Sequence, residues 1–218
     1  MEIALDPFFC WNDLILGSSP FGEGLNGLYE NRFGLHKHSS VSDIETICGD
    51  DICKNYYVFA LVRHPVDRLC SLYNFVGSVV QKWALQRGIS PKDVAAFIGG
   101  DSQASTPALR WPSFQAFVAT TSFSEFIRDE RLAVDNAFRT QVSRLRSLRE
   151  STIRAQFFRL EERDVWLPRV KDALGLDFNF THTNESELKL ITTDAVLPED
   201  RSYLKVRFAE DYATFDYH

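Results

Sequence analysis

A stretch around position 63 combines residue types that could bind an anion. Arg63 directly follows the continuous apolar run YYVFALV, residues 56–62, and Pro65 then suits the first turn of a helix. In open α/β sheets, ligands bind outside the carboxyl ends of the strands, and the free N–H groups at a helix N-terminus favour an anion. Ser71 lies about two helical turns into that helix, where its hydroxyl could reach a phosphate held by Arg63. The spacing predicts an anion site; the alternative is that Arg63 and Arg68 pair with nearby acids and that Ser71 faces water.

The histidines upstream of this stretch are candidates for acid–base chemistry. An imidazole can accept a proton from a hydroxyl near neutral pH, so His38 is the candidate general base and His36 is the second choice. The alternative is that His38 orients its loop or caps the helix that follows. Glu161, at the end of a predicted strand, is interpreted as an ion-pair partner that anchors neighbouring helices. Gln141 and the arginines of 139–149 either contact an acceptor or form a solvated helix face.

The apolar patterns around these residues predict an α/β protein with a central parallel sheet flanked by helices. The run 56–62 suits a strand buried on both faces, and TIRAQFFRL, within residues 152–160, suits a second strand. Residues 1–35 show no sustained period and are predicted to be irregular or to form short helical turns. Apolar residues at helical spacing predict helices over 41–48 after a serine cap, from Pro65 onward, over 114–126, over 133–150, over 163–174 with Gly175 as C-cap, and in the tail after 197–200.

Length and composition favour one domain, 1–218, of a soluble protein. The 218 residues suffice for a single core, and 44% hydrophobic and 25% charged residues are ordinary values for a globular protein. A net charge of −6 disfavours nucleic acid as a partner, because that binding depends on neutralising phosphates with Lys and Arg.

The sequence also predicts the compartment. No run approaches the roughly 18 apolar residues that indicate a membrane span, and the acidic N-terminus lacks the features of a signal peptide. A cytoplasmic location is therefore expected. The four cysteines include no CxxC pair and no zinc-like spacing, and they are interpreted as reduced thiols: Cys10, Cys48, Cys53 and Cys70.

The segment VRHPVDRLCSLY, residues 62–73, resembles the 3′-phosphate-binding motif of sulfotransferases that use 3′-phosphoadenosine-5′-phosphosulfate (PAPS). The resemblance is to the broad family of carbohydrate and heparan sulfate enzymes. In that family, the arginine after the strand and the serine eight positions later bind the 3′-phosphate, and these positions correspond to Arg63 and Ser71. Further segments are similar, in order, to bacterial-type or later family blocks: HKHSS at 36–40, WPSFQAFVATTSFSEFIR at 111–128, Gln141, FRLEE at 158–162, HTNES at 182–186, and the tail at 197–217.

The resemblance implies a three-layer, P-loop nucleotide-kinase-like sulfotransferase fold. It also implies in-line transfer of a sulfuryl group from PAPS to a hydroxyl or amine, with carbohydrates among the acceptors. No metal is expected, because fixed cations and helix-end amides can stabilise the charge on the leaving phosphate. A phosphoryl-transfer enzyme is disfavoured because the sequence lacks GxxxxGK[ST]. The sequence indicates neither the acceptor nor the oligomeric state.

The segment before His36 departs from the family pattern. The family opens with a strand and a loop like PKTGTS that holds the 5′-phosphosulfate, and no such loop stands between Met1 and His36. GSSPFGEG, residues 17–24, is glycine-rich, but it has no lysine and follows no apolar strand. We therefore expect either an N-terminally incomplete chain or a degenerate member that binds nucleotide poorly. The alternative function is a non-catalytic nucleotide-binding or scaffold protein that keeps only the 3′-phosphate site.

Overall fold

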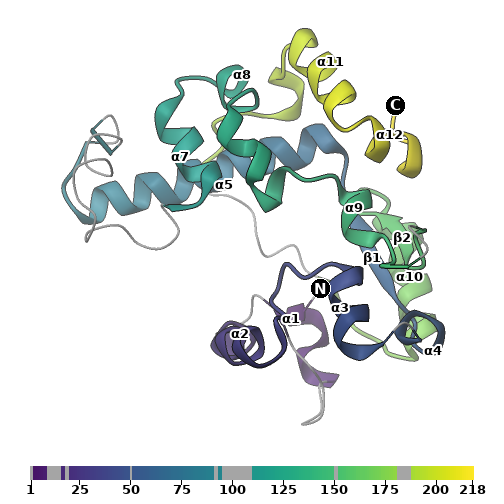
Figure 1. Cartoon of the computed structure of the whole chain (residues 1–218). Helices are drawn as coiled ribbons and strands as arrows, with labels where there is room; N and C mark the ends of the chain where they lie inside the picture. Colours follow the sequence, from purple (N-terminus) through teal and green to yellow (C-terminus); the bar gives the residue numbers. More distant parts are fainter. Residues whose placement is uncertain are drawn as a thin grey trace. The chain divides into compact units, whose positions relative to one another are not determined.

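The computed structural model describes residues 2–8, 16–17, 20–49, 51–90, 93–94, 110–149, 152–180 and 188–218 (Figure 1). The length predicts one domain, and the contacts within the chain group it into two compact units. The first unit comprises Met1–Arg63 and Gln141–Thr183, and the second comprises His64–Thr140 and Asn184–His218. Each unit is therefore assembled from two separate stretches of the sequence.

A short parallel sheet lies in the first unit. Strand β1 (Phe59–Val62) pairs in parallel with β2 (Gln156–Arg159), and Val62 stands opposite Arg159. The mixed α/β character and the parallel pairing of the two predicted runs are confirmed. β1 begins later than predicted because Tyr56 ends the helical turn before it and is 70% exposed. Within the described ranges the sheet has two strands, so β1 is paired on one side only rather than lying inside a larger central sheet.

The sheet is accompanied by short helices, two of which match their predicted ranges. The helix predicted over 41–48 forms because the Ser40 hydroxyl accepts the N–H of Asp43, while the Asp43 carboxylate accepts the N–H of Ser40. The helix predicted over 163–174 ends at Gly175, which adopts a left-handed φ of 64°. The helical elements of this unit are α1 (Glu2–Leu5), η1 (Asp6–Phe8), α2 (Pro20–Phe33), α3 (Val41–Cys48), α4 (Ile52–Asn55), α9 (Gln141–Leu145) and α10 (Arg163–Leu174).

The N-terminal stretch is more regular than its sequence suggests. Residues 20–33, expected to be irregular or to form short turns, form α2, a continuous helix of 14 residues. Part of this stretch also packs on the sheet, because Ala4 and Leu5 of α1 contact the apolar cluster that includes Phe158 and Trp166. Trp166 comes from α10, so this cluster lies between α10 and β2.

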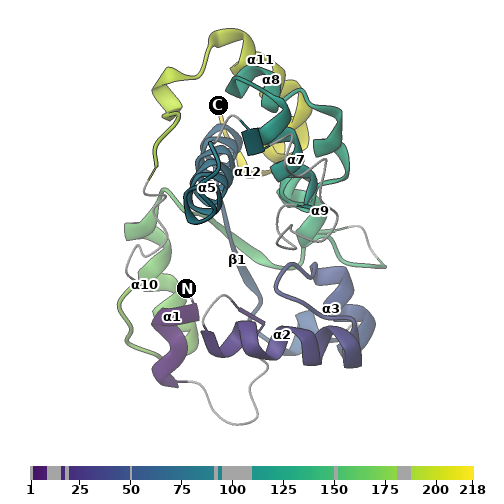
Figure 2. The same ribbon diagram turned by 90° about the vertical axis from the view of Figure 1, so that its left-hand side faces the viewer.

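The second unit is helical among its described residues. Its first helix begins at Pro65, as predicted, and its apolar face packs against residues from the middle of the chain and from the tail, including Phe126 and Phe208. In both views α8 lies beside α11 (Figures 1 and 2). The elements are α5 (Pro65–Gln86), α7 (Pro112–Ala119), α8 (Phe123–Phe126), η4 (Glu130–Val134), η5 (Asn136–Phe138), η6 (Thr193–Ala195), α11 (Pro198–Arg207) and α12 (Ala209–Phe215).

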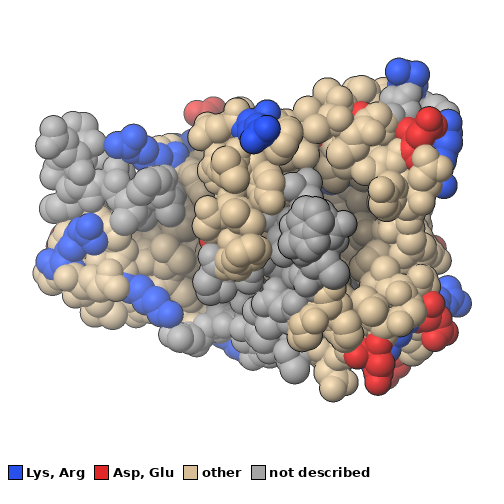
Figure 3. Space-filling model, turned by 90° about the horizontal axis from the view of Figure 1, so that it is seen from below, with Lys and Arg blue, Asp and Glu red and all other residues tan. Residues whose placement is uncertain are grey.

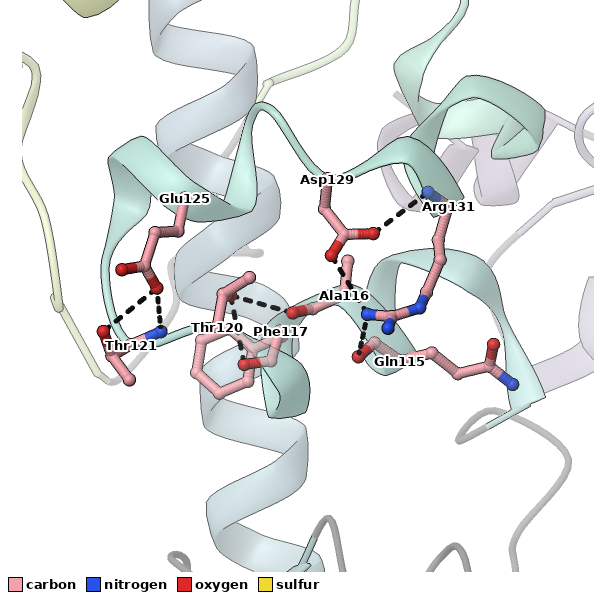
Figure 4. Close-up of polar contacts among 8 residues, drawn as sticks. All are labelled: Gln115, Ala116, Phe117, Thr120, Thr121, Glu125, Asp129 and Arg131. Carbon is pink, nitrogen blue, oxygen red and sulfur yellow. Dashed lines mark hydrogen bonds and ion pairs between the residues drawn. The ribbon is translucent and has the colours of Figure 1, made fainter.

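One helix is expected over 114–126, with Ser122 or Ser124 as a cap for a final turn; the structure has two helices, and Ser122 caps the second. The backbone at Thr120 is extended, and the Ser122 hydroxyl accepts the N–H of Glu125 at 3.2 Å to begin α8. The Glu125 carboxylate reaches back and accepts the N–H and the hydroxyl of Thr121 at 2.7 and 3.0 Å (Figure 4). The side chains of Ser122 and Glu125 thus bind main-chain N–H groups that would otherwise bond to carbonyls within one continuous helix. The helix therefore breaks here although its apolar spacing continues.

The helix predicted over 133–150 is also wrong, because Asp135 interrupts it. The Asp135 side chain is buried and accepts the N–H groups of Ser113 and Ala137, each at 2.7 Å. The carboxylate thereby starts η5 and ties it to the first turn of α7. Only the five residues of α9 continue the predicted helix.

No helix in the described ranges is long and apolar enough to cross a bilayer. Cys48, which is exposed, and Cys70, which is buried, form no disulfide with another described residue. Cys10 and the side chain of Cys53 lie outside the described residues.

Replacing Asp135 tests this account of the second unit. We expect Asp135→Ala to lower the free energy of unfolding by about 1–3 kcal/mol, because the buried N–H of Ser113 loses its acceptor. Chemical denaturation followed by circular dichroism measures the change. Glu130→Ala removes an exposed carboxylate from the same segment and should change stability by no more than about 0.5 kcal/mol. Equal effects of the two variants would contradict the role given to Asp135.

Candidate functional site

Arg63 lies at the carboxyl end of β1, where the sequence places it. The carbonyls of Val58 and Val62 accept N–H groups from the β2 segment at 2.8 and 2.7 Å, so the main-chain groups of Arg63 face the opposite edge of the strand. The side-chain amide of Gln141 binds both of them. Its Oε1 accepts the Arg63 N–H at 2.9 Å, and its Nε2 donates to the Arg63 carbonyl at 2.8 Å. The backbone that carries the Arg63 side chain is therefore fixed from both edges.

Arg63 is half-buried, and its guanidinium has no ion-pair or hydrogen-bond partner among the residues that the structure describes. Arg68 differs: it donates to the carbonyl of Arg139 at 2.9 Å, lies 3.9 Å from the buried carboxylate of Asp211, and stacks over Phe208. The alternative in which both arginines pair with acids thus fits Arg68 but not Arg63. A half-buried cation without a partner loses hydration without compensation, which favours a site that an anion completes.

Ser71 lies on α5, in the second unit, whereas Arg63 ends the first unit. Ser71 is half-buried, and no described residue forms a hydrogen bond with its hydroxyl. The start of α5 is capped by His64, whose Nδ1 accepts the N–H of Val66 at 3.2 Å, with Pro65 in the first helical position. Within its own unit, Ser71 therefore has a hydroxyl that a ligand could use.

The loop before α3 uses its two histidines differently. The main-chain N–H of His36 donates to the Ser39 hydroxyl at 2.9 Å, and the Nδ1 of His36 accepts the N–H of His38 at 3.0 Å. The His36 ring is thus part of the loop structure, whereas His38 is exposed. Ser40 caps α3, so His38 does not perform the capping role considered for it.

Arg144 connects α9 to this loop, because its guanidinium donates to the carbonyl of His38. Partial removal of water, followed by the positive charges of Lys37 and Arg144, lowers the pKa of His38 below its usual value. The imidazole is therefore neutral at neutral pH, as a general base requires. The role of His38 as base stays a prediction.

The surrounding charges are local. Lys37 forms an ion pair with Glu23 of α2, and Glu162, beside the exposed Glu161, pairs with Arg159 at 3.0 Å. Figure 3 shows one face, on which basic side chains of the described residues stand singly or in small groups among uncharged ones. In the same ranges, no group of three or more His, Cys, Asp or Glu side chains could hold a metal ion.

Comparisons of this chain with protein-family models, with curated proteins and with solved structures found no match. The resemblance to PAPS-dependent sulfotransferases therefore rests on the sequence segments that carry it. One of them, HTNES at 182–186, lies outside the described residues.

The role of α9 was not evident from the sequence. The sequence is compatible with either acceptor contact or a solvated helix face for Gln141 and the nearby arginines. In the structure, the Gln141 amide binds Arg63, and Arg144 binds the His38 carbonyl. The one available signal is their spacing, since residues three apart share a helix face. That signal does not show which main-chain groups they contact.

The electrostatic account of His38 can be tested by titration. We expect a pKa below the ordinary value of about 6.5 for its imidazole, measured by NMR as a function of pH. Arg144→Gln should raise the pKa of His38, because removing a nearby positive charge favours the protonated imidazole. The control is Arg169→Gln, which removes an exposed arginine from α10 and should leave the titration unchanged. A His38 pKa that ignores Arg144 would refute this account.

Proposed function

We propose that this protein binds the 3′-phosphoadenosine part of PAPS through Arg63 and takes part in sulfuryl transfer. The observation that carries the proposal is the Arg63 side chain: half-buried, at the carboxyl end of a parallel strand, and without a partner among the described residues. Guanidinium groups suit phosphate because they present several N–H donors in a planar fork. The resemblance of residues 62–73 to the 3′-phosphate motif supplies the identity of the ligand.

In the proposed reaction, the acceptor oxygen or nitrogen forms a bond to sulfur while the bond between sulfur and the bridging phosphate oxygen breaks. 3′-Phosphoadenosine-5′-phosphate leaves with that oxygen. His38 takes the proton of the acceptor, and Ser71 is the second group proposed to bind the 3′-phosphate. The acceptor class proposed is a hydroxyl or amine compound, carbohydrates included, and the mechanism uses no metal. The proposal also includes a three-layer, P-loop nucleotide-kinase-like fold, with which the parallel pairing of β1 and β2 is compatible.

A non-catalytic nucleotide-binding protein is the second candidate, and one observation favours it. The glycine-rich segment 17–24 was the nearest sequence to a phosphosulfate loop, but its residues 20–24 belong to α2. These are the first residues of that helix, and the segment contains no lysine, so it supplies no fixed cation to stabilise a leaving phosphate. Transfer of radiolabelled sulfate from PAPS to a panel of acceptors separates the two candidates, since only the enzyme yields labelled product.

Nucleotide binding tests the role of Arg63. We expect 3′-phosphoadenosine-5′-phosphate to bind more tightly than adenosine 5′-phosphate, as measured by calorimetry. Arg63→Ala should reduce that preference roughly 10- to 100-fold, because hydrogen bonds to charged groups contribute about 1.5–3 kcal/mol. Affinity for adenosine 5′-phosphate should change little, since it lacks the 3′-phosphate.

The matched control is Arg169→Ala, which removes an exposed arginine from α10 without touching β1. It should leave the preference intact. Equal affinity of the wild-type protein for the two nucleotides, or a preference that survives Arg63→Ala, would rule the assignment out.

A further inference from the structure

Helix α9 contacts both residues to which the proposed function gives a role in the first unit. From its first position, Gln141 binds the N–H and the carbonyl of Arg63 at 2.9 and 2.8 Å. One turn later, Arg144 donates to the carbonyl of His38. Residues three apart lie on the same face of a helix, so a single short helix holds the main chain at both places.

Helix α9 is itself held firmly. Val142 and Leu145 are buried, with 2% and 7% of their surface exposed. Directly after the helix, the Ser147 hydroxyl and the Leu148 N–H donate to the carboxylate of Glu45 at 3.0 and 2.7 Å. Glu45 lies on α3 and is 2% exposed. The position of α9 is therefore fixed by apolar packing and by a buried carboxylate.

A side-chain amide that binds both main-chain groups of one residue acts like a short piece of neighbouring strand. It restricts the φ and ψ angles of Arg63, and these angles set the direction in which the Arg63 side chain leaves the main chain. A guanidinium that must meet a phosphate oxygen within hydrogen-bond distance depends on that direction, because displacing it by about 1 Å removes much of the interaction. Both of these hydrogen bonds from the Gln141 amide go to the main chain of Arg63, and neither involves its guanidinium.

We propose that Gln141 is the positioning residue of the anion site: it sets the direction of Arg63 and thereby the preference for a 3′-phosphorylated nucleotide, without contacting the nucleotide itself. This inference rests on the proposed function, because it assigns Gln141 a role only through Arg63. Arg144 binds the carbonyl of His38 from the same helix. Helix α9 therefore holds the main chain of both the proposed anion-binding residue and the proposed base.

The experiment compares Gln141→Met with Gln156→Met in the full chain. Methionine keeps the length of the side chain but removes the amide. At position 156 the same change removes an exposed amide that accepts a hydrogen bond from the Tyr57 hydroxyl at 2.8 Å, at the amino end of β2. Calorimetry gives the affinities for 3′-phosphoadenosine-5′-phosphate and adenosine 5′-phosphate, and a thermal melt shows whether each variant is folded.

We expect Gln141→Met to reduce the preference for the 3′-phosphorylated nucleotide roughly 3- to 10-fold, with the affinity for adenosine 5′-phosphate little changed. A merely structural role would weaken both nucleotides alike and leave their ratio unchanged. Gln156→Met should also leave the ratio unchanged. If Gln141→Met does not fold, Gln141→Asn serves in its place, because the shorter amide cannot span both groups of Arg63.

The outcomes separate the two levels of the proposal. A wild-type protein with no preference, or one whose preference survives Arg63→Ala, overturns the proposed function and the role of Gln141 with it. A preference that is lost in Arg63→Ala but kept in folded Gln141 variants overturns the positioning role alone. A fall of equal size in Gln156→Met would show that any loss of a side-chain amide at the sheet has this effect, and would also overturn it.

Discussion

The pairing of the Gln141 amide with the main chain of Arg63 is the interaction on which the first unit depends. Parallel strands need a long connection, and here the chain between β1 and β2 passes through much of the second unit before it returns at Gln141. The returning chain satisfies the main-chain groups of Arg63 on the edge that β2 does not occupy. Because unpaired main-chain groups are unfavourable once water is excluded, this contact stabilises both the end of the strand and the start of α9.

Polar side chains join distant stretches in the second unit by the same principle. The amide of Asn74, on α5, accepts the N–H groups of Leu190 and Ile191 at 2.8 and 3.0 Å and donates to the Ile191 carbonyl at 2.8 Å. The carboxylate of Asp200 is buried and accepts the Ser124 hydroxyl at 2.5 Å, which joins α11 to α8. Each contact fixes a specific main-chain or side-chain partner, whereas the aromatic core between these helices only excludes water.

Local signals predicted the elements they control, and long-range contacts decided the rest. Some signals act within a few residues: the apolar run before Arg63, the cap at Ser40 and the C-cap at Gly175. The sequence therefore indicated α3 and α10 with their bounds, and β1 with a start three residues too early. Side chains that bind main-chain N–H groups interrupt the helices expected over 114–126 and 133–150. The Glu125 carboxylate accepts the N–H of Thr121 nearby, whereas the Asp135 carboxylate accepts the N–H of Ser113, 22 residues away. Apolar periodicity contains no information on such acceptors. Arg63 lies at the end of β1, as the sequence predicts. Its contact with Gln141 joins residues 78 positions apart, and the sequence pattern does not indicate it.

The charges around His38 have two opposing consequences for its proposed chemistry. Partial removal of water and the charges of Lys37 and Arg144 lower the pKa of the imidazole, which keeps it unprotonated and able to accept a proton at neutral pH. The same charges make it a weaker base, and general bases act best when their pKa lies near the working pH. Negative charge placed nearby would raise the pKa of His38 again, because it stabilises the imidazolium. A base of this kind becomes stronger when an anionic ligand occupies its surroundings, so proton transfer at His38 would be favoured in the bound state over the free protein.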